Sequence, residues 1–164
     1  MRARSALLLT TAIAAAAAWG CGTSEESGDV GDNLSAKGLE VTVERVDTSV
    51  PVPASDVTGL SRPSAGSELV AARVRVCNEH GGATGPFDFG LETSEGDGRL
   101  KFPQRNYTDS FDNLRDGCDS GWVVFEVPRG SEPESLTYEF QDTGTAMDES
   151  ENVDARLSWS VAGG

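Results

Sequence analysis

Most of the chain after residue 38 alternates between hydrophobic and polar positions, with the period of two that is typical of β-strands. The strongest such run is 122–127, in which both faces are largely apolar. We expect this strand to lie between two neighbours in a sheet and to end at Pro128, because proline cannot donate a ladder hydrogen bond. Six further runs alternate in the same way: 39–44, 68–77, 87–92, 100–102, 136–140 and 155–161.

Turn and loop residues separate these runs. Prolines and glycines fill 50–67, the sequence Glu95-Gly96-Asp97-Gly98 marks a hairpin turn, and 129–133 marks another turn. Residues 141–154 form an acidic loop. Without a convincing amphipathic helix, the pattern predicts one domain over residues 38–164, an all-β immunoglobulin-like antiparallel β-sandwich of about seven strands.

The loop from Pro103 to Gly117 is polar but carries three large hydrophobic residues, Tyr107, Phe111 and Leu114. We expect them to fold down over one end of the domain, because their burial is favourable.

The first twenty residues have the layout of a secretory signal peptide. Arg2 and Arg4 precede a short apolar stretch, and Gly20-Cys21 follows it as in a bacterial lipobox. We therefore predict that residues 1–20 are removed and that Cys21 is diacylated, which would anchor the protein at the extracytoplasmic face of the cell membrane. The alternative is cleavage after Ala18, which would release a soluble protein. Residues 21–37 are polar and are expected to form a flexible, disordered tether.

The three cysteines fit this exported location. Lipidation of Cys21 would leave Cys77 and Cys118 to form a disulfide. By alternation Cys77 shares a face with Arg73 and Arg75, whereas Cys118 precedes the strand that starts at Trp122. We therefore expect the bridge to join a strand end to a loop; a bridge through the core would require a bulge.

The charge balance limits the partners. The chain has 13 basic and 27 acidic residues, and its net charge of -14 becomes -16 when the two arginines of the leader are removed. Such a surface repels nucleic acid and anionic membrane, so neither is an expected partner. A basic partner or a cation fits the charge.

The sequence resembles a family of secreted bacterial lipoproteins that carry an immunoglobulin-like domain of unknown function, related to an immunoprotective extracellular protein of mycobacteria. The resemblance rests on 38–43, 74–78, 89–91 and above all 117–128. It implies a two-sheet sandwich on a tether, with no established catalytic site.

No residue pattern points to catalysis. The only histidine, His80, has no nucleophile motif to act on. Neither 95–98 nor 112–117 fits a calcium loop, and a weak cation site is conceivable only among Asp148, Glu149, Glu151 and Asp154. We therefore expect no cofactor and no metal.

The predicted function is a non-enzymatic binding or structural module, monomeric and held at the membrane by its lipid. Any protein partner is expected to contact the loops after Val76 and Phe102 and the loop 141–154. The alternatives are a small extracytoplasmic hydrolase and a weak cation-binding protein.

Overall fold

The computed structural model describes residues 24–48, 50, 62–79, 81–101, 107, 109–141 and 154–161. Within these residues the backbone forms nine strands and one 3-10 turn, which are β1 (Ser24–Asp29), β2 (Asn33–Ala36), β3 (Leu39–Asp47), β4 (Ser67–Asn78), η1 (Pro86–Asp88), β5 (Phe89–Thr93), β6 (Gly96–Leu100), β7 (Gly117–Pro128), β8 (Pro133–Gln141) and β9 (Asp154–Ser160). No helix in this part of the chain is long and apolar enough to cross a membrane. The predicted all-β class is confirmed.

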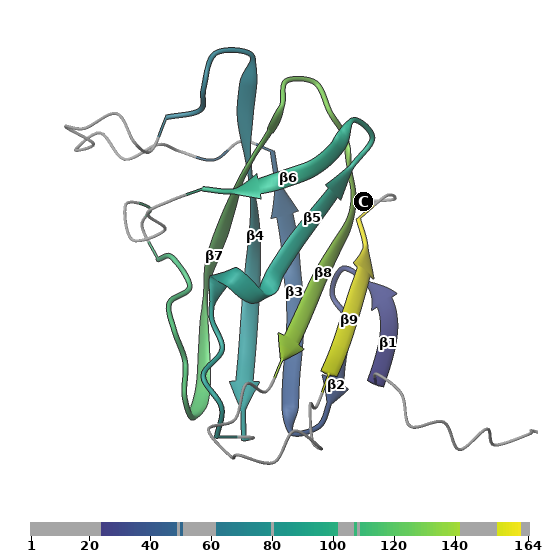
Figure 1. Cartoon of the computed structure of the whole chain (residues 1–164), viewed down its shortest axis with the longest axis vertical. Helices are drawn as coiled ribbons and strands as arrows, with labels where there is room; N and C mark the ends of the chain where they lie inside the picture. The colour runs from purple at the N-terminus through teal and green to yellow at the C-terminus, as the bar shows by residue number, and fades with distance from the viewer. Residues whose placement is uncertain are drawn as a thin grey trace, which may run out of the picture.

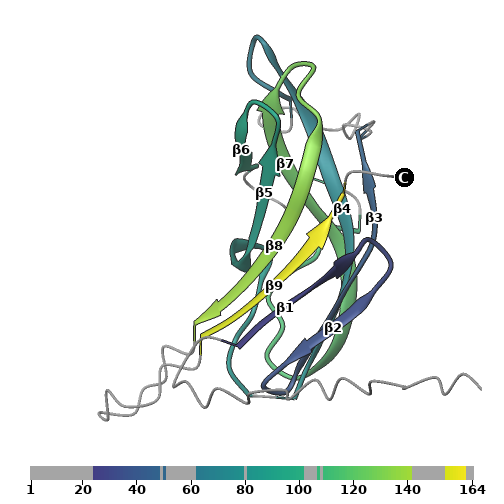
Figure 2. The ribbon, with the colours of Figure 1, turned by 90° about the vertical axis from the view of Figure 1, so that its right-hand side faces the viewer.

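The strands form one continuous hydrogen-bonded sheet that folds over into two layers (Figures 1 and 2). The strand order is β1-β9-β8-β5-β6-β7-β4-β3-β2. The fold-over is at β6, which pairs with β5 on one side and with β7 on the other. We call β1-β9-β8-β5 the β8 layer and β7-β4-β3-β2 the β4 layer. All the paired strands are antiparallel except β1, which runs parallel to β9.

The main core lies between the two layers and is built from the inward positions of the alternating strands. Its largest fully buried side chains are Trp159, Tyr138, Phe111 and Phe125. A second, smaller cluster lies on the outer face of the β4 layer and consists of Leu69, Ala71, Tyr107 and Val124. The prediction that 122–127 is apolar on both faces and lies inside a sheet is therefore confirmed, since β7 lies between β4 and β6.

The predicted disordered tether is wrong for residues 24–36. β1 contains no large hydrophobic residue, yet its backbone pairs with β9 along its whole length. β2 pairs with β3 and buries Leu34 and Ala36. The indole nitrogen Nε1 of Trp159 also donates to the carbonyl oxygen of Asp32 at 3.1 Å. Backbone hydrogen bonds to strand edges, together with these contacts, hold a polar segment whose composition indicates disorder, so the folded domain includes residues 24–36 and is not confined to residues from 38 onward.

The strand predicted to include Phe87 begins two residues later. Pro86 opens the 3-10 turn η1, and the carboxylate of Asp88 accepts the backbone N–H of Gly85 at 2.8 Å. Phe87 consequently leaves the strand pattern, and 70% of it is exposed.

The hairpin turn is also two residues earlier than predicted. Thr93 pairs with Gly96, so Ser94 and Glu95 make the turn and residues 96–98 belong to β6. The Thr93 hydroxyl closes the turn by donating to the Gly96 carbonyl at 2.6 Å. Phe102 lies outside the described residues.

The loop before β7 buries large hydrophobic residues as predicted, but Tyr107 packs on the outer face of the β4 layer and not over one end of the domain. Tyr107 and Phe111 are 4% and 1% exposed, and Leu114 packs partly against the main core. Phe111 donates its backbone N–H to the Trp122 carbonyl, and Trp122 donates to Asp109, so this segment runs beside β7. The approach is close: a Cβ added to Gly121 would lie 2.3 Å from the backbone nitrogen of Phe111.

Candidate functional site

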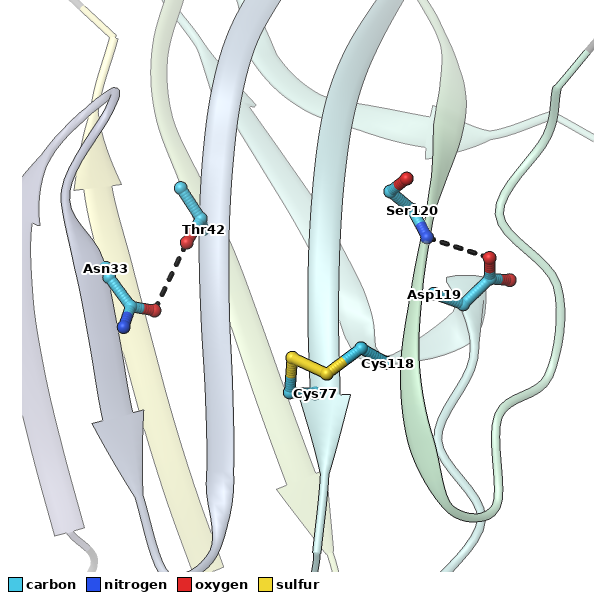
Figure 3. Close-up of a disulfide and its surroundings, with 6 residues drawn as sticks. All are labelled: Asn33, Thr42, Cys77, Cys118, Asp119 and Ser120. Carbon is cyan, nitrogen blue, oxygen red and sulfur yellow. Dashed lines mark hydrogen bonds between the residues drawn. A yellow bond between two sulfur atoms is a disulfide. The ribbon is translucent and has the colours of Figure 1, made fainter.

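The predicted disulfide between Cys77 and Cys118 is present, with an S–S distance of 2.08 Å (Figure 3). The two cysteines are directly opposite each other in the β4–β7 pair, and Cys77 lies on the outer face of its layer with Arg73 and Arg75, as the alternation predicts. The prediction that Cys118 lies in a loop is wrong. β7 begins at Gly117 because it pairs with β4 over the full length of both strands.

The bridge closes one end of the β4 layer without passing through the core. In the β2–β3 pair of the same layer, the Thr42 hydroxyl donates to the side-chain oxygen of Asn33 at 3.1 Å (Figure 3). The Asp119 carboxylate accepts the backbone N–H of Ser120 at 2.8 Å beside the bridge. The disulfide thus links two adjacent strands of one layer, which differs from the immunoglobulin bridge between two sheets.

The described parts of two predicted contact loops, the one after β4 and the one before β7, meet at one end of the sandwich. β4 and β8 both end there, and β7 begins there (Figure 1). Thr84, in the loop after β4, exchanges backbone hydrogen bonds of 2.9 and 2.8 Å with Leu114, in the loop before β7. Residues 80, 102–106, 108 and 142–153, which complete these loops, lie outside the described residues.

A buried hydrogen-bond chain fixes the loop after β4 to the β8 layer. The Thr84 hydroxyl donates to the Asp88 carboxylate at 2.8 Å and lies 2.5 Å from the Tyr138 hydroxyl. Burial raises the pKa of the Tyr138 hydroxyl. The hydrogen bond to Thr84 opposes this shift, and the charge of Asp88 adds to it. Because the Thr84 hydroxyl donates its proton to Asp88, the neutral phenol of Tyr138 is the donor to Thr84. Burial also raises the pKa of Asp88, while hydrogen bonds from Gly85 and Thr84 oppose that shift.

The outer face of the β8 layer is hollowed beside this loop. One hollow of about 640 Å³, which we call the Phe87 hollow, is lined by Ala83, Phe87, Asp88, Phe89, Gly90, Leu91, Glu92, Asp97, Gly98, Thr137, Glu139 and Arg156. A second hollow of about 910 Å³ shares Glu92, Thr137 and Arg156 with it and continues along β1 and β9. The two hollows therefore form one continuous depression.

The depression follows from small residues at the outward positions and acids at its rim. Gly90, Thr137 and Ser158 occupy neighbouring strands, and a Cβ added to Gly90 would lie 2.7 Å from the Thr137 hydroxyl. Around them the carboxylate of Glu92 accepts from the Ser135 hydroxyl at 2.8 Å, and that of Glu139 lies 3.4 Å from Arg156 Nε. Acidic side chains outnumber basic ones in the Phe87 hollow, with Arg156 as the one basic residue in its described lining.

Several residues singled out in the sequence lie outside the described residues. These are Cys21, His80, Asp148, Glu149 and Glu151, and the side chain of Asp154 at the start of β9 also lies outside the description. Among the described residues, no three metal-binding side chains gather into one group.

Sequence reasoning missed the Phe87 hollow. The small outward residues of β5, β8 and β9 were a signal for it, since alternate Gly, Ser and Thr positions leave a sheet face uncovered.

No protein-family model matches the chain, and no curated protein matches it. Two solved structures share its fold. MPT63, a secreted protein of Mycobacterium tuberculosis, is 20% identical with a TM-score of 0.53, and the match covers 85% of this chain and 99% of that one. A predicted lipoprotein of Bacillus subtilis, ycdA, is 14% identical with a TM-score of 0.50 over 80% of this chain, and the chain spans 38% of its length. At these identities the likeness shows the β-sandwich fold alone.

Proposed function

We propose that the protein is an extracytoplasmic, lipid-anchored binding module without enzymatic activity, and that the Phe87 hollow is its contact surface. The observation that carries the proposal is a large aromatic side chain, 70% exposed, in the lining of a depression that also carries acidic residues. An exposed aromatic beside a polar hollow is typical of a binding surface, where one ring contributes much of the contact energy.

The composition of the hollow defines the chemistry of the partner. Glu92, Asp97 and Glu139 line the same hollow as Phe87 with their carboxylates, and the whole chain carries a net charge of -14. Electrostatic steering by such a surface favours a cationic partner. The best fit is a protein segment with an apolar side chain flanked by lysine or arginine.

The absence of enzymatic activity is proposed on the residues themselves. Asp88, the acid with a raised pKa, is held by Thr84 and Gly85 in a network that fixes a loop. The only histidine of the chain is His80, and no nucleophile motif accompanies it. A structural role therefore accounts for Asp88.

Export and anchoring are proposed from the leader, from Gly20-Cys21 and from the resemblance to the secreted lipoprotein family. The secreted location of MPT63 and the predicted lipidation of the Bacillus protein belong to those proteins. Both locations agree with the export proposed for this chain. The Cys77–Cys118 disulfide supports the same proposal, because disulfides persist in exported proteins.

The test is photo-crosslinking on intact cells. A crosslinkable residue replaces Phe87 in one variant and exposed Arg129, in the β7–β8 turn, in a control. We expect an adduct from position 87 that contains a basic protein, and its loss when Glu92→Gln and Asp97→Asn are added. The same adduct from position 129, or no adduct from position 87, would contradict the assigned surface. A substrate turnover by the purified protein that is lost on changing His80 would contradict the non-enzymatic role.

A further inference from the structure

Two arginines lie over one tryptophan ring on the outer face of the β4 layer, on the opposite side of the sandwich from the Phe87 hollow. The guanidinium carbon of Arg45 lies 4.8 Å from the ring centroid of Trp122, and that of Arg73 lies 5.7 Å from it. Arg45 and Arg73 are directly paired across β3 and β4, and Arg73 pairs with Trp122 across β4 and β7. Three neighbouring strands thus contribute one group.

A β-bulge places Arg45 in this group. The register of β3 against β4 shifts between Val43 and Arg45. Glu44 is the extra residue, so Glu44 and Arg45 together lie opposite the single residue Arg73. Val43 is fully buried in the core, and strict alternation would direct Arg45 to the same side. The inserted residue reverses the alternation and directs Arg45 to the outer face, a use that bulges commonly have at binding sites.

The arginines of this face are incompletely neutralised. The Glu44 carboxylate lies 3.7 Å from Arg73 Nε. Among the residues that the structure describes, no acid makes an ion pair with Arg45 or with Arg75, the next outward residue of β4. Both are exposed, and three of the chain's 13 basic residues therefore gather on one face of a strongly acidic protein.

Contact with the indole ring restricts the orientations of these guanidinium groups. A guanidinium that lies over an indole ring keeps its N–H groups in the plane around its rim, available for hydrogen bonds. Such planar, preorganised donors bind a carboxylate or a phosphate through two parallel hydrogen bonds. Because Trp122 is only half-buried, a bound group can reach these guanidinium groups from solvent.

We propose that Arg45, Arg73 and Trp122, together with Arg75, form a binding site for a small dissolved molecule that carries a phosphate or carboxylate group. A compact ligand fits better than an anionic polymer or membrane. The net charge of -14 repels an extended polyanion. A single oxyanion beside the arginines is attracted mainly by those arginines, because charges farther away than the screening length of about 10 Å have little effect on it. This site is separate from the proposed contact surface at Phe87.

The test is a titration of the intact, nitrogen-15-labelled protein with inorganic phosphate and, separately, with succinate, each at constant ionic strength set with sodium chloride. The indole N–H resonance of Trp122 and the Nε–H resonances of the arginines report binding at the site. The indole of Trp159, which is buried in the core, is an internal reference. We expect saturable shifts at Trp122 with at least one probe, and Arg45→Gln should weaken the affinity by about tenfold or more.

Arg129→Gln is the matched control, because it removes one exposed arginine at the β7–β8 turn and should leave the affinity unchanged. Equal shifts with chloride alone, or an affinity unaffected by Arg45→Gln, would overturn the proposal. Sedimentation adds a second arm: a dimer that Arg45→Gln dissociates would assign this face to another copy of the chain. Binding to anionic lipid vesicles in the absence of any response to phosphate or succinate would also refute the small-molecule site.

Discussion

The clearest energetic prediction concerns Glu126, an acid on the outer face of β7. Its carboxylate lies 2.6 Å from Lys101 Nζ and 3.7 Å from the guanidinium of Arg99, and it accepts the backbone N–H of Ser64 at 3.0 Å. The side chains of Glu126 and Lys101 are only 5% and 14% exposed. This ion pair is therefore largely shielded from solvent.

The magnitude follows from the pKa of Glu126. Burial opposes ionisation, but hydrogen bonds from Lys101 and Ser64 and the charge of Lys101 outweigh it and lower the pKa from 4.5 to about 2. Because the folded pKa is depressed, the charged form stabilises the fold fully above pH 4.5, and this contribution is lost as the pH falls towards 2. The difference corresponds to about 3 kcal/mol. Glu126→Gln should lose that amount at neutral pH, since it removes the carboxylate that accepts the hydrogen bonds of Lys101 and Ser64.

The assay is urea unfolding followed by circular dichroism at about pH 7 and about pH 2.5, with the free energy of unfolding taken from each curve. The gap between the parent protein and Glu126→Gln should shrink from about 3 kcal/mol at neutral pH to about 1 kcal/mol at about pH 2.5, because the pKa of about 2 leaves part of the contribution in place. Glu139→Gln is the control, because its pair with Arg156 is solvent-exposed and should contribute less than about 1 kcal/mol. A gap that is the same for both variants at neutral pH, or that does not shrink in acid, would refute the reasoning.

Three further predictions concern the covalent and steric features of the chain. Replacing Cys77 and Cys118 by alanine should lower the free energy of unfolding by up to about 4 kcal/mol, measured in urea, because the bridge closes a loop of 41 residues. Gly121→Ala should cost about 2 kcal/mol or more in the same assay, because its Cβ would meet the backbone of Phe111 at 2.3 Å. Mass spectrometry of the membrane fraction should find a diacylated peptide that begins at Cys21, and a mature chain that begins earlier and is free in the medium would contradict this.

The strands that could be predicted are those whose stability comes from burying alternate side chains. β3, β4, β7, β8 and β9 each present such a stripe to the core, so hydrophobic periodicity was sufficient to find them. β1 and the first residues of β7 lack this signal. They are strands because a neighbouring edge offers backbone partners, which is a tertiary property that composition does not encode. The misplacement of Cys118 in a loop has the same cause.

The candidate sites were harder to predict because each depends on a local break in alternation. Phe87 has the spacing of an inward strand residue, but the turn that begins at Pro86 takes it out of the strand and exposes it. Arg45 has the spacing of a core position, and the inserted Glu44 reverses its direction. A bulge or a short turn costs little free energy locally, so a change at one residue can move a side chain from one face of the sheet to the other.

The two proposed sites lie on opposite outer faces, and the packed core between them determines how they relate. The inward neighbours of Arg45 and Arg73, such as Val46, Ala72 and Val74, pack into that core between the layers. A ligand on one face could influence the other only by shifting these side chains between two packed arrangements, because coupling requires an element with two states. A β-sandwich core held by long, regular strand pairs and a disulfide offers no such element in the described residues. Binding at Arg45 should therefore leave the affinity at Phe87 unchanged, and the effects of substitutions on the two faces should add.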